Sequence, residues 1–476
     1  MRHEMRESQM RMQEQVMMSA RNARADKLIE KWSKTPVIGQ GILDMAGKNL
    51  EKARGLAIVL ENQENAMKHM KEEGTLISSV FGTTPENVVR IIRLAYPNSV
   101  RGELFREWAM ETARDSIYYL NPVYGKTLRG ATAGNNIYDI GEGDYPTEVM
   151  VTKATMASAV GTITSLDVAP IRPFTVKVEA DGAIVGVDDG AGNLIGTGLD
   201  ASAENTINYT TGATKFTLAT VPTDAGSVQI RYNYDSEVEA NFDQLGSVEL
   251  QLKAYQFRAI PHPLYVKWTK MTELLLNTTL DIDAEEQLIS AAADEIKKAL
   301  DFQAVGLAYR SAKANTGVVF DCKQATGESE ISRMTAFSKA IDAAGDAMLD
   351  EINRGGVTKL VGSPDAITKI KLHARFSAAN RQPKVGIYRE GSLDGIDVYK
   401  APTTVIPSKT ILAIYKNELQ PEDVSVAFGT LIPLYRTQTL EHSNFVTETG
   451  LSNFGDAKVL NGKYLRLITL DHINNE

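Results

Sequence analysis

The pattern of hydrophobic and polar positions predicts one long amphipathic helix in the second half of the chain. From Asp283 to Ala312, apolar residues such as Ile289, Ile296 and Leu307 recur at spacings of three, four and seven. This spacing places them on one face of a helix. At ~1.5 Å per residue, the helix would be ~45 Å long, which suits a brace across a flat subunit.

Shorter helices and strands follow this helix. A second helix is predicted from Ile331 to Asn353, and Ser363-Pro364 is typical of the start of a third. The segments expected to be strands are Val357–Val361, Gly386–Tyr388, Ile396–Tyr399, Thr410–Tyr415, Val424–Pro433 and Gly462–Leu470. Helices that alternate with strands, followed by a late return to strands, indicate mixed α/β and α+β layers.

A different pattern fills the middle of the chain. Between Val168 and Tyr234, apolar residues alternate with polar ones, which predicts short strands with one buried face. Turn residues such as Asp188–Asn193 separate these strands, so the segment is interpreted as a small inserted β-sandwich. A further strand is predicted from Gly246 to Ile260, and residues 120–150 have the Gly, Asn and Pro composition of loops and hairpins.

The first 75 residues show a helical pattern with few large apolar side chains. Leu50, Leu56, Leu60 and Met67 lie among many charges. Because these side chains are too few for a core, the segment is predicted to be a partly mobile helical arm that gains order on a neighbour.

Two further helices are predicted after this arm. One runs from Thr84 to Pro97, and the other begins near Val100 and continues through Leu104, Trp108 and Thr112.

Composition limits the classes of function. The 476 residues favour two or three domains, and 43% hydrophobic with 23% charged residues is ordinary for a globular protein. A net charge of −9 argues against a dedicated nucleic-acid binder. The lone Cys322 excludes an intrachain disulfide. The sequence shows neither a secretory signal nor a membrane-spanning run, so synthesis in the cytosol is expected.

Motifs for catalysis are missing from the sequence. There is no HExxH pair, phosphate-binding loop or GxSxG elbow, and Gly39-Gln40-Gly41 lacks the third glycine of a dinucleotide site. Asp188-Asp189 does not continue into a calcium-loop pattern. The chain is therefore predicted to be no enzyme and to need neither a cofactor nor a metal.

Three stretches of the second half resemble one protein family. The helix Asp283–Ala312 is similar to its spine helix, and GVTKLVGSPDAITKIK is similar to its strand–Ser-Pro–helix step. GSLDGIDVYKAP and ILAIYKNELQPEDVSVAFGTLIPL resemble the strands at the edge of its axial domain. The family is the major capsid protein of tailed bacteriophages, with the HK97-like fold and closest to its T-even-type branch; the match covers residues 242–473.

The resemblance implies an α+β fold with an N-terminal arm, an extended loop, a peripheral domain and an axial domain. The boundaries predicted on this basis are 1–75 for the arm, 76–119 for a helical lead-in, 120–167 for the extended loop, 168–236 for the β-sandwich, 237–330 for the peripheral domain with the spine helix, 331–435 for the axial domain and 436–476 for the return to the peripheral domain.

The resemblance also implies hexameric capsomers in an icosahedral or prolate shell around double-stranded DNA. Vertex, scaffold, portal and decoration proteins are the implied partners. Leu28-Ile29-Glu30 fits the signal of a prohead protease, and Lys126 and Arg129 in the extended loop are candidates for intersubunit ion pairs. Two alternatives stay open: a non-viral nanocompartment shell of the same fold, and an adhesin built around the β-module.

Overall fold

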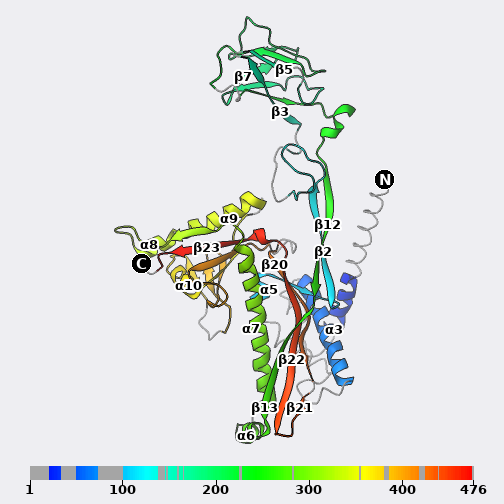
Figure 1. The fold of residues 1–476 in the computed structure, drawn as a ribbon, viewed down its shortest axis with the longest axis vertical. Helices are drawn as coiled ribbons and strands as arrows, with labels where there is room; N and C mark the ends of the chain where they lie inside the picture. The colour runs from blue at the N-terminus through cyan, green and yellow to red at the C-terminus, as the bar shows by residue number, and fades with distance from the viewer. Residues whose placement is uncertain are drawn as a thin grey trace. The chain divides into compact units, whose positions relative to one another are not determined.

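The computed structural model divides the chain into two compact units (Figure 1). Unit 1 comprises Met1–Tyr119 and Lys253–Glu476, and unit 2 comprises Leu120–Leu252. The described residues are 21–33, 50–72, 100–137, 145, 148–157, 160–163, 166–223, 228–280, 284–352, 355–379, 385–417, 424–437 and 439–473.

A five-stranded sheet forms one half of unit 1. Its strands follow the order β1 (Arg106–Ala109), β20 (Val426–Arg436), β22 (Val446–Val459) and β13 (Ile260–Thr269), and β21 (Leu440–Glu441) pairs with β22. The helix α7 (Ala284–Ala312) packs beside this sheet, and Ile289 and Ile296 are buried in one cluster with Leu434 and Leu451 (Figure 1). The predicted spine helix therefore lies where the sequence placed it.

A seven-stranded sheet forms the other half of unit 1. Its strand order is β14 (Val318–Asp321), β23 (Leu465–Asp471), β19 (Thr410–Ile414), β15 (Lys359–Gly362), β18 (Ile396–Lys400), β17 (Tyr388–Leu393) and β16 (Phe376–Ala378). The helices α9 (Ser338–Ile352) and α10 (Pro364–Ile370) pack on it, with Met348 and Ile367 in the same core as Leu360.

These two sheets divide the chain differently from the predicted axial and peripheral segments. β20 was assigned to the axial segment 331–435, but it lies in the five-stranded sheet with β13 and β22. β23 was assigned to the peripheral return 436–476, but it pairs with β19 and β14 in the seven-stranded sheet. The apolar face of β23, including Ile468, completes the core under α9, which accounts for its place there.

The helix predicted from Ile331 to Asn353 is two helices. α8 (Glu330–Thr335) begins at the Ser329 cap, and α9 begins only at Ser338. Phe337 lies at the break and is fully buried, 5.4 Å from the ring of Phe320. Burial of this ring accompanies the interruption of the predicted helix.

The helix predicted through Trp108 and Thr112 is wrong. α5 (Val100–Leu104) ends at Leu104, and Trp108 lies in β1, paired in parallel with Gly429 of β20. Pairing with a buried strand overrides the helical spacing, because strand preference is set by the tertiary surroundings. The helix predicted from 84 to 97 lies outside the described residues.

Unit 2 contains a two-sheet β-module. One sheet has the order β4 (Thr155–Ala157), β5 (Val160–Ile163), β10 (Thr214–Thr217) and β9 (Thr206–Ile207). The other has the order β3 (Val149–Lys153), β11 (Gln229–Asn233), β6 (Lys177–Ala180), β7 (Ala183–Asp188) and β8 (Leu194–Ile195). Phe216 of the first sheet and Ile230 of the second share one buried core. Three strands precede Val168, so the module begins before its predicted boundary.

A two-stranded ribbon connects the units. It consists of β2 (Arg114–Tyr124) and β12 (Val248–Arg258), and the short helix η3 (Glu239–Gln244) precedes β12. On β12, Val248 is 62% and Leu250 43% exposed. A two-stranded ribbon is marginal in water without further packing.

The N-terminal segment is helical over residues 21–33 and in α3 (Leu50–Glu72), as Figure 1 shows. The described part of this segment packs against the rest of its own chain. Trp32, only 1% exposed, and Leu60 lie in the cluster of the five-stranded sheet. Gln63 of α3 is fully buried and its Nε2 donates to the carbonyl of Leu434 at 2.8 Å.

Candidate assembly surfaces

The helix formed by residues 21–33 is held on unit 1 by ion pairs. The helix contributes the acidic side chain to one of them and the basic side chain to others. Asp26 accepts two hydrogen bonds from Arg54 of α3, at 2.8 and 2.9 Å. Lys31 Nζ lies 2.6 Å from Glu61 and 2.5 Å from Glu64. The helix therefore meets α3 through complementary charges at several points along the contact.

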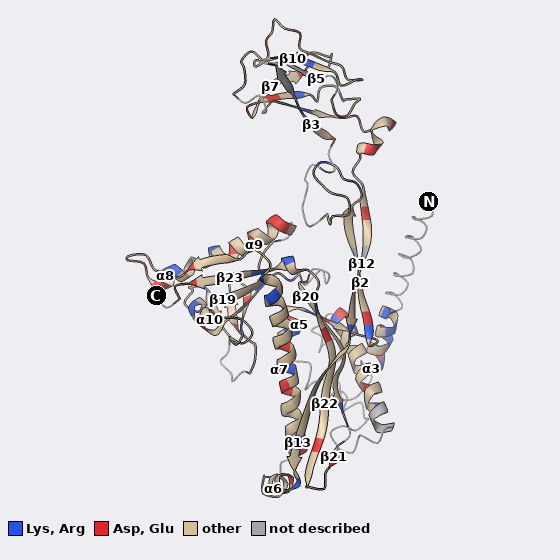
Figure 2. Cartoon of the chain, in the orientation of Figure 1, with Lys and Arg blue, Asp and Glu red and all other residues tan. Residues whose placement is uncertain are grey.

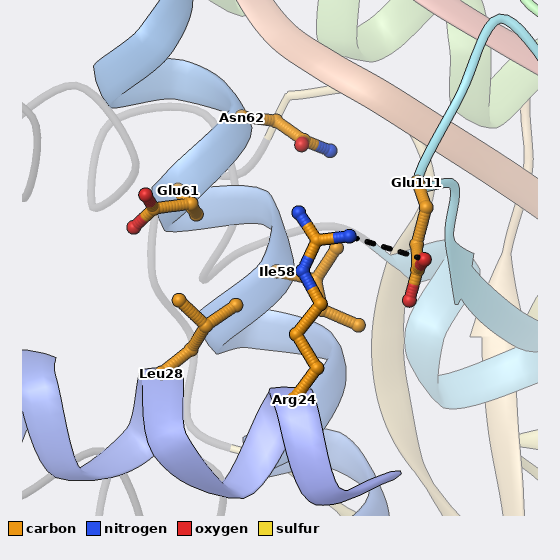
Figure 3. A pocket seen from close by; sticks show the side chains of 6 residues that line it. All are labelled: Arg24, Leu28, Ile58, Glu61, Asn62 and Glu111. Carbon is orange, nitrogen blue, oxygen red and sulfur yellow. Dashed lines mark ion pairs between the residues drawn. The ribbon is translucent and has the colours of Figure 1, made fainter. Parts of the chain in front are cut away.

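The same helix also contacts β1 and the segment that follows it. Arg21 donates to the carbonyl of Ala109 at 2.6 Å, and its guanidinium lies 3.7 Å from the centre of the Trp108 ring. Both Arg21 and Arg24 pair with Glu111, at 3.3 and 3.7 Å. Figure 3 shows Arg24 directed at Glu111 in a shallow pocket that Leu28 and Ile58 also line.

The charges of this contact alter the acidity of its members. The Arg54 hydrogen bonds hold the pKa of Asp26 below its ordinary value. Burial alone would raise the pKa of Glu64, but hydrogen bonds from Lys31 and Lys68 outweigh it, and the pKa of Glu64 is lowered. Carboxyl groups with lowered pKa values stabilise the docked helix while they are ionised.

We expect acid to release this helix. The stabilisation is present above the ordinary values of 3.8 for Asp26 and 4.5 for Glu64, and it is lost as the pH falls through the lowered pKa values. Hydrogen exchange of residues 21–33, measured between pH 7 and pH 3, should accelerate below about pH 4.5 relative to α7. Exchange that stays slow in this helix while α7 is intact would contradict the ionic docking.

Leu28-Ile29-Glu30, the predicted protease signal, lies inside this docked helix. Leu28 and Ile29 are half-buried against the core cluster, whereas Glu30 is exposed. Proteases cut exposed or transiently opened segments. The signal is therefore protected as long as the helix stays docked.

Arg129 of the extended loop has its partners within unit 2. Its backbone has the left-handed φ of +49°. Its guanidinium donates to the carbonyl of Tyr145 at 2.7 Å, to the hydroxyl of Tyr234 at 3.0 Å and to the carbonyl of Gln244 at 3.2 Å. These bonds tie the loop to the base of the β-module within one copy of the chain. An ion pair between Arg129 and a neighbouring subunit stays a prediction.

Lys126 keeps an exposed charge. Its Nζ lies 3.3 Å from the carbonyl of Asp243 and 3.7 Å from the carboxylate of the same residue. The side chains of Lys126 and Asp243 are 39% and 99% exposed. An exposed pair of this kind contributes only about 0–1 kcal/mol, so both groups are free to exchange partners.

An apolar face is exposed on the helix α6 (Lys270–Leu280). Met271, Leu274 and Leu275 recur at helical spacing and are 67%, 60% and 55% exposed. Sequence reasoning missed this surface, because the same spacing is usual for a helix that faces its own core. A monomer gains nothing from such a face, so it indicates a surface for another protein chain.

Clusters of metal-ligating side chains are lacking in the part of the chain that the structure describes. No group of three His, Cys, Asp or Glu side chains there could hold a metal ion. Over the same residues, no helix is both long and apolar enough to cross a bilayer.

Comparison with known proteins identifies the family. The family model described as major capsid protein Gp23 matches residues 83–453, and the chain belongs to this family. It is thus a structural protein that forms a capsid shell, is not an enzyme and has its place in the virion. The predicted α+β HK97-like capsid fold is confirmed. A search of curated proteins found no match.

Solved structures give low similarity. A chain of Microbacterium phage Oxtober96 is 9% identical, covers 78% of this chain and 91% of its own, and has a TM-score of 0.37. The capsid of Myoviridae phage XM1 is 10% identical, with 68% and 89% covered and a TM-score of 0.32. The SrpI encapsulin complex of Synechococcus elongatus PCC 7942 is 9% identical, with 47% and 77% covered and a TM-score of 0.32.

Proposed function

We propose that the chain forms hexameric capsomers, which tile an icosahedral or prolate shell around packaged double-stranded DNA. The observation that carries this proposal is the capsid family match over residues 83–453. The exposed apolar residues of β12 and α6 support it, because a shell subunit covers such surfaces with its neighbours. Assembly then depends on several modest contacts, each strengthened when the lattice closes.

The charge of the chain fits a wall around DNA. The net charge is −9, and along α7 Lys and Arg are interspersed with Asp and Glu (Figure 2). Phosphate binding needs clustered positive charge. We therefore propose that the wall encloses the DNA without binding a sequence.

We propose further partners and a processing step on the same basis. Vertex, scaffold, portal and decoration proteins would join the shell, and synthesis would take place in the host cytoplasm. A prohead protease would cut after Leu28-Ile29-Glu30 once the helix that holds the signal has left its docking surface. Lys126 would pair with a carboxylate of a neighbouring subunit.

Electron microscopy of the purified protein tests the shell. We expect closed particles or curved sheets, and DNA in particles taken from infected cells. Monodisperse monomers at high concentration would overturn the proposal and favour the adhesin reading. Particles that hold a cargo enzyme in place of DNA would favour the nanocompartment reading, which the capsid family match does not favour.

We expect the double variant Leu274→Glu and Leu275→Glu to fold but not to assemble. Both side chains are more than half exposed, so the unfolding temperature should change by less than about 4 °C, while particle formation falls at least tenfold. The control variant Asn277→Glu and Thr279→Glu adds the same charge at exposed polar positions of the same helix. Equal assembly of the two variants, judged by sedimentation, would remove α6 from the interface.

A further inference from the structure

One sheet of the β-module has an outer face that departs from the usual composition of an exposed sheet face. In the sheet β3-β11-β6-β7-β8, residues such as Val178, Ile230 and Leu194 point into the module core. The residues that alternate with them point away from the core, and in an antiparallel sheet such positions are normally polar. Here they include the apolar residues Val151, Ile184, Val187 and Ile195, which are 43%, 56%, 39% and 55% exposed.

The pairing register aligns these apolar residues with basic residues of the same sheet. Arg231 of β11 lies opposite Val151 of β3 on one side and Lys177 of β6 on the other. Lys177 lies opposite Val187 of β7, which lies opposite Ile195 of β8. This row crosses the whole sheet, a width of about 19 Å. The basic–apolar face is defined here as this row together with its neighbours Lys153, Gln229, Glu179 and Ile184.

This face is basic, although the module is acidic. Residues 149–233 contain five Lys and Arg against eight Asp and Glu. Three of the five, Lys153, Lys177 and Arg231, lie on the basic–apolar face. Glu179 on the same face is already bound, since it accepts from Gln229 at 2.8 Å and pairs with Arg231 at 3.2 Å. Lys153 and Lys177 are exposed, and neither side chain has an ion pair or a hydrogen bond with another described residue.

A second copy of the module does not match this face. Two basic–apolar faces in contact would bring lysines together, and like charges repel. On the opposite sheet, the exposed Lys215 is already paired with Glu204 at 2.9 Å. Asp189 and Asp200 lie in turns, where their carboxylates accept hydrogen bonds from nearby backbone N–H groups. The surface that would match is acidic and carries apolar side chains of its own.

We propose that the basic–apolar face binds a separate, acidic protein of the virion. The proposal rests on the proposed shell, and it assigns a docking surface to one of its decoration proteins. The two unpaired lysines would orient this protein through opposite charge, and the aliphatic side chains would supply the buried area. Apolar side chains left bare on every copy would promote association between particles, so the protein that covers them belongs to the finished particle.

Crosslinking of particles from infected cells tests this contact. A water-soluble carbodiimide condenses a lysine amine with a carboxylate in contact with it, with loss of water and without a spacer. We expect peptides that join Lys153 or Lys177 to an aspartate or glutamate of a different protein. Lys215 is the internal control, because Glu204 lies 2.9 Å away and should give a link within the module. Linked Lys215, together with Lys153 and Lys177 that are unlinked or linked only to this chain, would overturn the proposal.

A matched pair of variants tests the role of charge. Lys177→Glu places a carboxylate on the basic–apolar face, and Lys215→Glu makes the same change at an exposed strand position of the opposite sheet. We expect Lys177→Glu particles to hold about tenfold less of the crosslinked protein per copy of the chain, because the new charge repels an acidic partner. Lys215→Glu particles should hold the wild-type amount. Equal amounts in the two kinds of particle, measured by gel densitometry, would overturn the proposal.

The remaining outcomes are also distinguishable. Protein that forms no particles would refute the proposed shell, whereas wild-type particles without the crosslinks would refute the docking surface alone. If Lys177→Glu particles do not form, the crosslinks of wild-type particles decide. Wild-type particles could instead float with vesicles of phosphatidylglycerol and phosphatidylcholine but not with phosphatidylcholine alone. Flotation of this kind that Lys177→Glu abolishes, without crosslinks to another protein, would assign the face to a lipid surface and overturn the protein partner.

Discussion

Ile296→Asp is expected to abolish folding of unit 1. Ile296 lies on the buried face of α7 at 7% exposure, in one cluster with Ile289, Leu300 and Leu434. The substitution removes an apolar side chain from the core and leaves a carboxylate there without a designed partner. The combined cost, about 5 kcal/mol or more, is comparable to the whole stability of a typical domain.

Ala299→Asp is the matched control for this substitution. Ala299 lies three residues further along α7 and is exposed, so the same new charge meets water. Its expected cost is only the lower helix propensity of aspartate, below about 1 kcal/mol. Soluble Ile296→Asp protein with the circular dichroism and melting curve of the Ala299→Asp variant would refute the burial of this face.

Deletion of Val149–Asn233, with a two-glycine bridge, should leave unit 1 folded. Val149 pairs with Asn233 across β3 and β11, so the cut ends are neighbouring strand partners about 5 Å apart. The deletion removes the β-module with its complete core, and no strand is left without its sheet. We expect a soluble product in which unit 1 unfolds within a few degrees of the wild-type temperature.

A deletion with the boundaries predicted from the sequence provides the contrast. Removing Val168–Tyr234 leaves β3 without its partner β11, and leaves the β4–β5 pair without β10, the partner of β5. Unpaired strands with apolar faces promote aggregation, so this product should be insoluble. The reverse outcome, in which the shorter deletion is soluble and the longer one is not, would show that the module boundaries are misplaced.

The sequence was informative where periodicity and burial agree. The apolar stripe of α7 is long and regular, so its bounds were predicted to within one residue at the N-terminus and matched at Ala312. β15, β18 and β19 were also expected near their places, because they are short apolar runs between turn residues. In each case the local pattern and the tertiary environment demand the same element.

β22 shows why other parts could not be predicted. This strand has 14 residues, but polar Thr447, Thr449 and Asn453 are among its buried positions. For two of them, residues outside the strand supply a hydrogen-bond partner: Arg436 donates to Thr449 at 3.2 Å, and Asn453 donates to the carbonyl of Pro433 at 2.8 Å. A strand with buried polar residues lacks the hydrophobic alternation by which strands are predicted from a sequence.

The candidate surfaces could not be predicted from the sequence for a related reason. The sequence of residues 21–33 shows mixed charges, which are usual for a solvated helix, and only the positions of Arg54, Glu61 and Glu111 give those charges partners. The pairing of Arg129 with Tyr145 and Tyr234 likewise joins residues far apart in the chain. Charge in a sequence indicates exposure, whereas its function depends on what the fold brings opposite.

The adjacency of Val149 and Asn233 also makes the β-module a natural grafting point. A polypeptide whose own ends lie about as close together could be spliced in at these two strands. Every copy of the chain would then carry it, so a single genetic fusion would yield a densely repeated array of the grafted domain.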